Sequence, residues 1–295
     1  MVKWVVLFLI LSGAGLYILF SYSPSSDLND TVSSANSIGD REETLPQRVF
    51  REDFNQEGVL EEVGGMEGSE NPYWWVSSGG RLILTGGLGK TIQGDLPLES
   101  DWRRRYAEYN SDSTDFGVHP QNIFRLVGRS KWANARQGVY FRIVQNNLSK
   151  SSRRDRSNGV LLLNRYRDSD NLYYAGLRVD GAAVIKKKLA GKYFTMNYEK
   201  VVSGTYDRGG NPSLLPTGRW IGIKVEAVNE TRDTVSIRLL VDWNRNGNWE
   251  LVASAKDDGK KYGGKAFVPG GYGGIRTDFM DVEFEDYKIE EIGGE

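Results

Sequence analysis

From residue 47 onward, the chain consists of short stretches in which apolar and polar residues alternate, and Gly, Asn and Asp separate these stretches. Alternation with a period of two is typical of strands that bury one face. No linker or repeat separates the strands, so we predict one all-β domain over residues 47–292, an antiparallel two-sheet β-sandwich. The pattern predicts a short helix over residues 101–109 and strands over residues 49–54, 81–85, 124–128, 139–145, 160–166, 172–179, 183–189, 220–228, 235–243, 249–254, 274–276 and 280–289.

The alternation divides the central strands into two faces. One face is apolar, and we expect it to fill the space between the sheets: Val139, Phe141, Ile143, Leu161, Leu163, Ala175, Leu177, Val179 and Ile185. The other face is aromatic and cationic: Tyr140, Arg142, Asn164, Tyr166, Tyr174, Arg178, Lys186 and Lys188. Because we expect these strands to be near neighbours in one sheet, we predict that Tyr140, Arg142, Asn164, Tyr166, Tyr174 and Arg178 converge on one ligand-binding surface.

The first residues follow a different pattern. Residues 4–22 carry no charge, and as a helix they would span about 28 Å, close to the thickness of a bilayer core. Lys3 precedes this run, which predicts a membrane anchor over residues 1–23 with the rest of the chain on the extracytoplasmic side. A cleaved signal peptide is the alternative, and it would make the protein secreted. Residues 24–46 are rich in Ser, Asp and Asn, so we expect a flexible linker.

Composition removes several classes of protein. The chain has no Cys, which excludes disulfide scaffolds, cysteine nucleophiles and thiolate zinc sites. Its formal net charge of -1 gives no overall attraction to nucleic acid, so we expect no nucleic-acid partner. The charge is unevenly distributed, because residues 124–167 hold eleven Arg and Lys but one acid, Asp155. Arg forks match carboxylates and sulfates and Tyr rings stack on sugars, so this segment favours an acidic glycan as partner.

Several strands together resemble a known superfamily. The segments are residues 50–54 (FREDF), 158–163 (NGVLLL), 171–179 (NLYYAGLRV), 218–221 (GRWI), 273–276 (GGIR) and 282–287 (VEFEDY). Their succession is similar to the concanavalin A-like lectin/glucanase jelly roll, in the laminin-G-like branch of bacterial sugar-binding and sugar-cleaving modules. The resemblance spans residues 47–292 and implies a sandwich whose first and last strands are neighbours.

Asp242, Asn244 and Asn246 place oxygens at alternate positions, as the first half of a calcium loop does. The bidentate Glu that closes such a loop is missing, because Ala253 stands at its position. Asn246 followed by Gly247 between two alternating runs is also a strong hairpin signal. We therefore predict a hairpin, with a structural calcium ion as the alternative, and we expect no other cofactor.

Carboxylates spaced by two indicate a catalytic alternative. Asp281, Glu283 and Glu285 are similar to the Glu-x-Asp-x-Glu arrangement of laminarinase-type enzymes, and paired carboxylates perform glycoside hydrolysis. The order of Asp and Glu differs, and the motif lies in the last strand, so an acidic structural face or a set of calcium ligands is the alternative. Glu226 is a further candidate acid.

A polysaccharide lyase would instead use Tyr166 or Tyr174 as the base, beside an Arg that neutralises a uronate. His119 is the only histidine, which excludes metal sites built on several His. No nucleophile elbow accompanies it, so we expect a loop histidine with a structural hydrogen bond.

These patterns favour a membrane-anchored, extracytoplasmic domain that binds carbohydrate, in particular an acidic polysaccharide or glycoconjugate, without catalysis. A glycoside hydrolase or polysaccharide lyase on the same fold is the first alternative. A surface or assembly protein without a sugar ligand is the second.

Overall fold

The computed structural model describes residues 48–293. The predicted membrane anchor (residues 1–23) and linker (residues 24–46) lie outside this range. Within it, no helix combines the length and the apolar character that crossing a membrane requires.

Sixteen strands make up most of the described chain and form two antiparallel sheets, which confirms the predicted all-β sandwich. All predicted strands and the predicted helix are present, and four short or edge strands, over residues 58–61, 74–78, 88–90 and 192–200, were not predicted. The helices are α1 (Asp101–Tyr109) and the 3-10 turns η1 (Met66–Gly68) and η2 (Pro120–Asn122). The strands are β1 (Val49–Glu52), β2 (Gly58–Glu61), β3 (Trp74–Ser78), β4 (Arg81–Thr85), β5 (Leu88–Lys90), β6 (Ile123–Trp132), β7 (Ala135–Asn146), β8 (Gly159–Asp168), β9 (Asn171–Arg178), β10 (Ala182–Leu189), β11 (Lys192–Lys200), β12 (Trp220–Asn229), β13 (Val235–Asp242), β14 (Glu250–Asp257), β15 (Gly271–Asp278) and β16 (Met280–Glu291).

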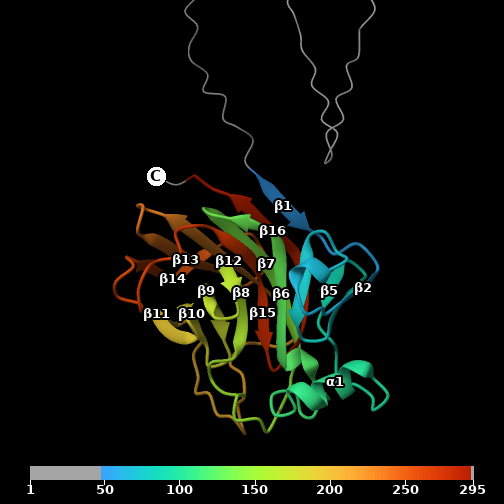
Figure 1. The fold of residues 1–295 in the computed structure, drawn as a ribbon. Coiled ribbons are helices and arrows are strands. Elements are labelled where there is room, and N and C mark those ends of the chain that lie inside the picture. The colour runs from blue at the N-terminus through green and yellow to red at the C-terminus, as the bar shows by residue number, and fades with distance from the viewer. Residues whose placement is uncertain (1–47, 294–295) are drawn as a thin grey trace, which may run out of the picture. The chain divides into compact units, whose positions relative to one another are not determined.

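The two sheets stack face to face (Figure 1). Sheet A has the order β14-β13-β12-β7-β16-β5-β4-β2, and β1 also pairs with β16. Sheet B has the order β11-β10-β9-β8-β15-β6-β3. The pairing of β1 with β16, which sets Val49 opposite Glu290, makes the first and last described strands neighbours, as the family resemblance implies.

The hydrophobic core lies between the sheets. Its members include Val139, Phe141, Ile143, Ala175, Leu177, Val179 and Ile185, as predicted. Leu161 and Leu163 are a correction, because they are buried in a second cluster on the outer face of sheet B, while Val160 and Leu162 face the core. Residues 160–163 are all apolar, so alternation along β8 does not tell one face from the other.

A β-bulge in β8 explains a second correction. The register of β8 against β9 shifts after Asn164, and Arg165 has a φ of 48°. An extra residue in one strand reverses the facing of every residue beyond it. Asn164 lies before the bulge and has the same parity as Leu162, so it faces inward, where its Oδ1 accepts a hydrogen bond from Gln137 Nε2 at 2.7 Å. Tyr166 lies beyond the bulge and therefore packs in the outer cluster.

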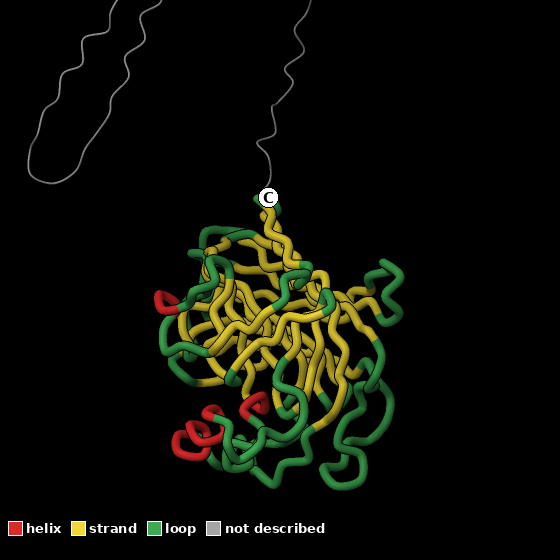
Figure 2. Tube along the Cα trace, turned by 90° about the vertical axis from the view of Figure 1, so that its right-hand side faces the viewer, coloured by secondary structure: helices red, strands yellow, loops and turns green. Residues whose placement is uncertain are grey.

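α1 lies at the end of the sandwich opposite the start of β1, among the long loops that Figure 2 shows there. The Ser100 side chain caps its N-terminus. The Tyr106 hydroxyl donates a hydrogen bond to Glu62 at 2.5 Å and accepts one from the Gly79 N–H at 2.8 Å. These bonds fix the helix to the turn between β3 and β4, and the loop that follows it reaches the outer face of sheet B.

Candidate functional site

A cleft of about 390 Å³ opens on the outer face of sheet B, beside the loop that follows α1. Six strands, β6, β8, β9, β10, β11 and β15, supply residues to it. Lys186 on β10 lies directly opposite Tyr174 on β9, and Arg276 on β15 lies opposite Leu161 on β8. Tyr193 on β11 completes the strand side. The loop side consists mainly of Asn110, Ser113, Arg153, Asp155, Ser157 and Asn158.

Two tyrosines give the cleft its aromatic character. The rings of Tyr174 and Tyr193 meet edge to face, with centroids 6.1 Å apart and planes at 74°. The Arg276 guanidinium lies 5.8 Å from the Tyr174 ring centroid, and the Lys188 ammonium lies 5.0 Å from that of Tyr193. Rings with cations beside them offer an apolar face to a sugar ring and donors to its substituents.

Lys186 is a cation of this cleft whose charge is not neutralised. Arg276 donates to Asp278 through Nε at 3.0 Å and Nη2 at 2.9 Å, and Arg178 pairs with its own aspartate, Asp180, at 2.8 Å. Among the residues that the structure describes, Lys186 has neither an ion pair nor a side-chain hydrogen bond. Burial, followed by the charges of Arg178 and Arg276, lowers the pKa of Lys186. An anionic group bound here would relieve this electrostatic penalty.

Local hydrogen bonds hold the rim of the cleft in place. Asp155 Oδ1 accepts from the N–H of Ser157 at 2.6 Å and from its hydroxyl at 2.5 Å, and Asn158 Oδ1 accepts from the Asp155 N–H at 2.7 Å. On the loop after α1, the buried Ser113 hydroxyl has no hydrogen-bond partner within the described range. Because leaving a buried hydroxyl unpaired costs free energy, a polar ligand group that reaches Ser113 would gain this bond.

The predicted ligand residues do not form one surface, which corrects the prediction. Tyr140 and Arg142 belong to β7 in sheet A, whereas Tyr166, Tyr174 and Arg178 belong to β8 and β9 in sheet B. Alternation identifies the faces of a strand, but the loop between β7 and β8 carries the chain to the other sheet, and no periodicity records that change. Of the predicted set, Tyr174 lines the cleft, and Tyr166 lies on the same outer face.

Tyr140 and Arg142 are bound by their own neighbours in sheet A. The Tyr140 hydroxyl donates to Asp242 Oδ2 at 2.9 Å, and its ring packs against Trp249 with centroids 5.7 Å apart. Burial and the hydrogen bond to Asp242 raise the pKa of Tyr140 to about 12. Arg142 Nε donates to Glu283 Oε2 at 2.8 Å. These side chains therefore already have strong partners within the sheet.

Two of the candidate catalytic carboxylates are ion-paired on sheet A, away from the cleft. Glu283 is bound by Arg142 and Lys90. Burial alone would raise the pKa of Glu283, but the hydrogen bonds from these two cations lower it. Glu285 pairs with Arg245 at 2.6 Å, and burial raises the pKa of Glu285.

The other two candidate acids are also occupied. Glu226 accepts from Arg136 at 2.7 Å and from Arg238 at 2.8 Å, in the same outer face of sheet A. Asp281 is buried and accepts from the Gly94 N–H at 2.6 Å and from the side-chain amides of Gln121 and Asn147 at 2.9 and 3.0 Å. None of the four carboxylates lines the cleft on sheet B.

Asp242 serves a hairpin turn. Its Oδ1 accepts from the N–H groups of Asn244 and Asn246, both at 3.2 Å, and its Oδ2 accepts from the Gly247 N–H at 2.8 Å and from the Tyr140 hydroxyl at 2.9 Å. Four donors occupy the acceptor sites of this carboxylate. The loop joins β13 to β14, so the predicted hairpin is confirmed. Within residues 48–293, no group of three or more acidic, His or Cys side chains is arranged to hold a metal ion.

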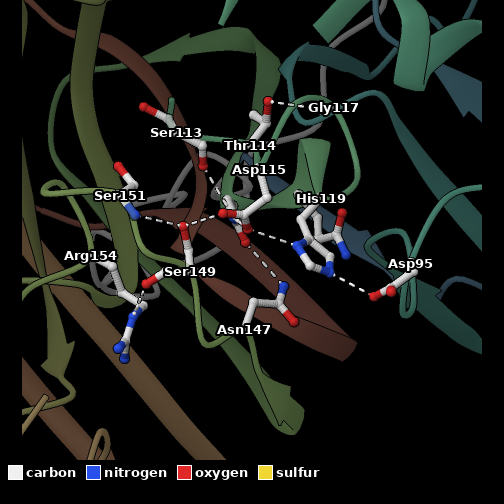
Figure 3. A network of polar contacts seen from close by, with 12 residues as sticks. Asp95, Ser113, Thr114, Asp115, Gly117, His119, Asn147, Ser149, Ser151 and Arg154 are labelled. Carbon is white, nitrogen blue, oxygen red and sulfur yellow. Dashed lines mark hydrogen bonds and ion pairs between the residues drawn. The ribbon is translucent and has the colours of Figure 1, made fainter. Parts of the chain in front are cut away.

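His119 lies in a network of polar contacts at the α1 end (Figure 3). Its Nδ1 is 2.9 Å from Asp115 Oδ2, and its Nε2 is 2.8 Å from Asp95 Oδ1. The Ser149 hydroxyl donates to Asp115 Oδ1 at 2.6 Å rather than to the imidazole. In a catalytic triad the hydroxyl contacts the imidazole. The contacts therefore agree with the predicted structural histidine, which here connects its own loop to the loop that carries Asp95.

The predicted ligand residues miss most of the cleft, including Lys186, Tyr193 and Arg276. Lys186 was predicted on the polar face of its strand but not as a ligand residue. Arg276 lies in a predicted strand, but the partner strands that bring it beside Tyr174 come from distant parts of the chain. Tyr193 lies in β11, a largely exposed edge strand. The sequence signal that could have indicated β11 was Ala190-Gly191. These residues form a two-residue turn between β10 and β11, with φ values of 47° and 79°.

No family model matches the chain, and no curated protein matches it. Among solved structures, it is similar to the carbohydrate-binding module CBM66 from Bacillus subtilis, with 13% identity and a TM-score of 0.40 over 73% of this chain and 94% of that one. It is also similar to the β-glucanase from Bacillus licheniformis, with 9% identity and a TM-score of 0.41 over 83% and 98% of the two chains. The GH43 protein BlXynB from the same species has 12% identity and a TM-score of 0.43, over 82% of this chain but 39% of that one.

These similar structures are a carbohydrate-binding module, a β-glucanase and a GH43 protein, and their TM-scores all lie below 0.5. At such low similarity they carry no argument about the ligand. Which ligand the chain takes has to be argued from its own cleft.

Proposed function

We propose that the protein binds an acidic polysaccharide or glycoconjugate in the cleft on sheet B and does not cleave it. The observation that carries this proposal is the environment of Lys186. This lysine is partly buried, it feels the charges of Arg178 and Arg276 more strongly than those of Asp155 and Asp180, and its ammonium group has no ion pair within the described residues. A uronate carboxylate or a sulfate would supply the missing negative charge.

The rest of the cleft suits a sugar ring. Tyr193 is exposed, Tyr174 lies beside it with 5% exposure, and the unpaired hydroxyl of Ser113 lies on the loop side. Asp155 and Asp278 are the acids of the lining, and Asp278 is already neutralised by Arg276. A hexose with one anionic substituent therefore matches the apolar, polar and cationic parts of the lining together.

An enzyme remains the second candidate, and two observations weigh against it. A lyase base must lose its proton, but burial raises the pKa of both Tyr166 and Tyr174. A hydrolase needs an acid and a second carboxylate free to act on the bond, whereas Glu226, Glu283 and Glu285 are held by cations on the other sheet.

We also propose that residues 1–23 anchor the domain to a membrane and that residues 24–46 tether it on the extracytoplasmic side. The uncharged run at residues 4–22 after Lys3 supports this topology. Protease added to intact cells should then digest the domain, and a domain that stays whole under this treatment would contradict the topology.

The function is tested by incubating the full-length protein, in detergent, with polygalacturonate, alginate and hyaluronate and with neutral xylan and levan. We expect retention on one or more of the acidic polymers and no product. New ultraviolet-absorbing unsaturated ends would identify a lyase, and new reducing ends alone would identify a hydrolase. Absence of binding to every acidic polymer would reject the proposal.

A further inference from the structure

The outer face of sheet A carries a second hollow, of about 600 Å³, on the opposite side of the sandwich from the cleft. Its floor is Gly138 on β7. A β-carbon built at Gly138 would meet Ile223 O at 3.3 Å and Lys224 Cβ at 3.5 Å, and its φ is not in the left-handed region. The backbone conformation therefore does not demand glycine at this position, although a β-carbon would press on the Ile223 carbonyl, and the missing side chain is what leaves the floor open.

One cross-strand row through this floor concentrates positive charge. Arg51 on β1 lies opposite Lys288 on β16, Lys288 lies opposite Gly138, and Gly138 lies opposite Lys224 on β12. Adjacent strands are about 5 Å apart, so the two lysines approach the glycine from both sides. Like charges in directly opposed positions destabilise a sheet, and an anion over Gly138 would offset this repulsion.

The adjacent row has the opposite character. It reads Glu290, Arg136, Glu226 and Arg238 across β16, β7, β12 and β13, so its charges alternate in sign. Each contact along this row is an ion pair. Of these two rows, only the one that contains Gly138 carries more cations than acids.

The hollow is lined by four cations and four acids, and each acid already has a partner within the described chain. Glu52 accepts hydrogen bonds from the Phe54 N–H and the Trp74 indole, and Asp286 lies 3.9 Å from Arg245. Glu290 pairs with Lys288 as well as with Arg136, and Asp53 accepts hydrogen bonds from Asn55. Neither Lys224 nor Arg51 has an ion pair within the part of the chain that the structure describes. Burial, followed by the charge of Arg136, lowers the pKa of Lys224.

Aromatic rings form the wall beside this row. The Lys224 ammonium lies 3.7 Å from the Trp249 ring centroid, and the Trp249 and Tyr140 rings pack together. They lie directly over Gly222, where a β-carbon would come within 2.6 Å of the Trp249 ring and 2.8 Å of the Tyr140 ring. Because Gly222 has no side chain, the two rings can pack directly on the sheet. They then border the open floor at Gly138.

From this juxtaposition we infer a second binding site for an anionic saccharide, with the anionic group over Gly138 between Lys224 and Lys288 and the sugar ring against Trp249. The ligand class rests on the proposed function, but the site does not share a residue with the cleft on sheet B. A domain with a site on each face binds two glycan segments at once, so it can hold two polysaccharide chains together.

The test counts ligands. Radiolabelled trigalacturonate is added to the full-length protein in detergent, and the number bound per chain at saturation is measured by equilibrium dialysis. We expect two for the parent, one for Gly138→Gln, which fills the floor without changing a charge, and one for Lys186→Met, which removes the cation of the cleft. Lys224→Met leaves the floor open and should also give one. Lys192→Met, an exposed lysine on β11, is the control and should give two.

The outcomes separate the two proposals. If the parent binds one trisaccharide, if Gly138→Gln and Lys224→Met still bind one, and if Lys186→Met binds none, the second site is overturned and the cleft is left in place. If the parent binds one trisaccharide, if Gly138→Gln and Lys224→Met bind none, and if Lys186→Met still binds one, the cleft is overturned instead. Free acetate or sulfate that competes as well as the trisaccharide would show an anion site without sugar recognition, which also overturns the inference.

Discussion

Lys186 and Lys187 are consecutive on β10, yet their ammonium groups lie on opposite faces of sheet B. Lys187 Nζ is 2.8 Å from Asp257, both side chains are 0% exposed, and Nζ also donates to the carbonyls of Gly264 and Lys265. Lys186 lines the cleft without such a partner. One lysine thus stabilises the fold, and its neighbour is left available for a ligand.

This relationship predicts opposite effects of the same substitution. Lys187→Met leaves the Asp257 carboxylate buried without a cation, which should lower the free energy of unfolding by about 3–5 kcal/mol. Lys186→Met removes an unneutralised charge and should leave the free energy of unfolding unchanged or higher. Urea unfolding of both variants checks this. Equal losses of stability in the two variants would contradict the assignment of the two lysines.

The lowered pKa of Lys186 predicts how binding depends on pH. An acidic ligand needs the ammonium form, so affinity should fall as the pH rises through the pKa of Lys186, which lies below the ordinary lysine value of 10.5. Without ligand, stability has the opposite trend. In the alkaline window between the folded and unfolded pKa values the unfolded chain binds more protons, so the contribution of this lysine to stability rises with pH. Affinities measured across that window, with Lys186→Met as the reference that lacks this step, test the sign.

Tyr174 separates binding from catalysis. If its ring stacks on a sugar, Tyr174→Phe should keep most of the affinity, and Tyr174→Ala should weaken binding by about 1–2 kcal/mol through the lost ring contact. Binding of an acidic oligosaccharide to the two variants gives the comparison. A turnover present in the parent and lost by orders of magnitude in Tyr174→Phe would instead identify the hydroxyl as a base.

Core packing makes a prediction that is independent of function. Leu177 is 0% exposed between the sheets, so Leu177→Ala should lower the free energy of unfolding by about 2–5 kcal/mol. Leu240 lies half-buried on the outer face of sheet A, opposite Lys224, and Leu240→Ala should cost much less. Denaturant unfolding of the two variants tests which face of β9 and of β13 is turned to the core. Similar losses in the free energy of unfolding would place both leucines in the core and contradict the structure.

Much of the fold follows from local sequence. The strands alternate apolar and polar residues, the helix at residues 101–109 has a Ser cap, and Asn246-Gly247 specifies a hairpin, so each is encoded within a few residues. The side chains that point to the core were predictable where the other side of the strand is polar, as for Phe141 and Leu177. They were not predictable in β8, where residues 160–163 are apolar on both faces and a bulge follows Asn164.

The candidate site was only partly predictable for a related reason. Tyr174 and Lys186 belong to one hairpin, so their facing and proximity follow from neighbouring strands. Tyr140 and Arg142 have the same pattern, but they lie in the other sheet because the chain crosses over after β7. Arg276 reaches Tyr174 only through the pairing of β15 with β8, a long-range contact that no local pattern specifies.

The central claim is that the cleft recognises negative charge on a sugar through Lys186. The most direct measurement compares the affinity of the protein for polygalacturonate with its affinity for the same polymer after chemical reduction of its carboxyl groups, in the parent and in Lys186→Met. A hydrogen bond to a charged group is worth about 1.5–3 kcal/mol, so the parent should bind the acidic polymer at least tenfold more tightly, and Lys186→Met should lose most of that preference. Equal affinity of the parent for the two polymers, or a preference that survives in Lys186→Met, would contradict the account.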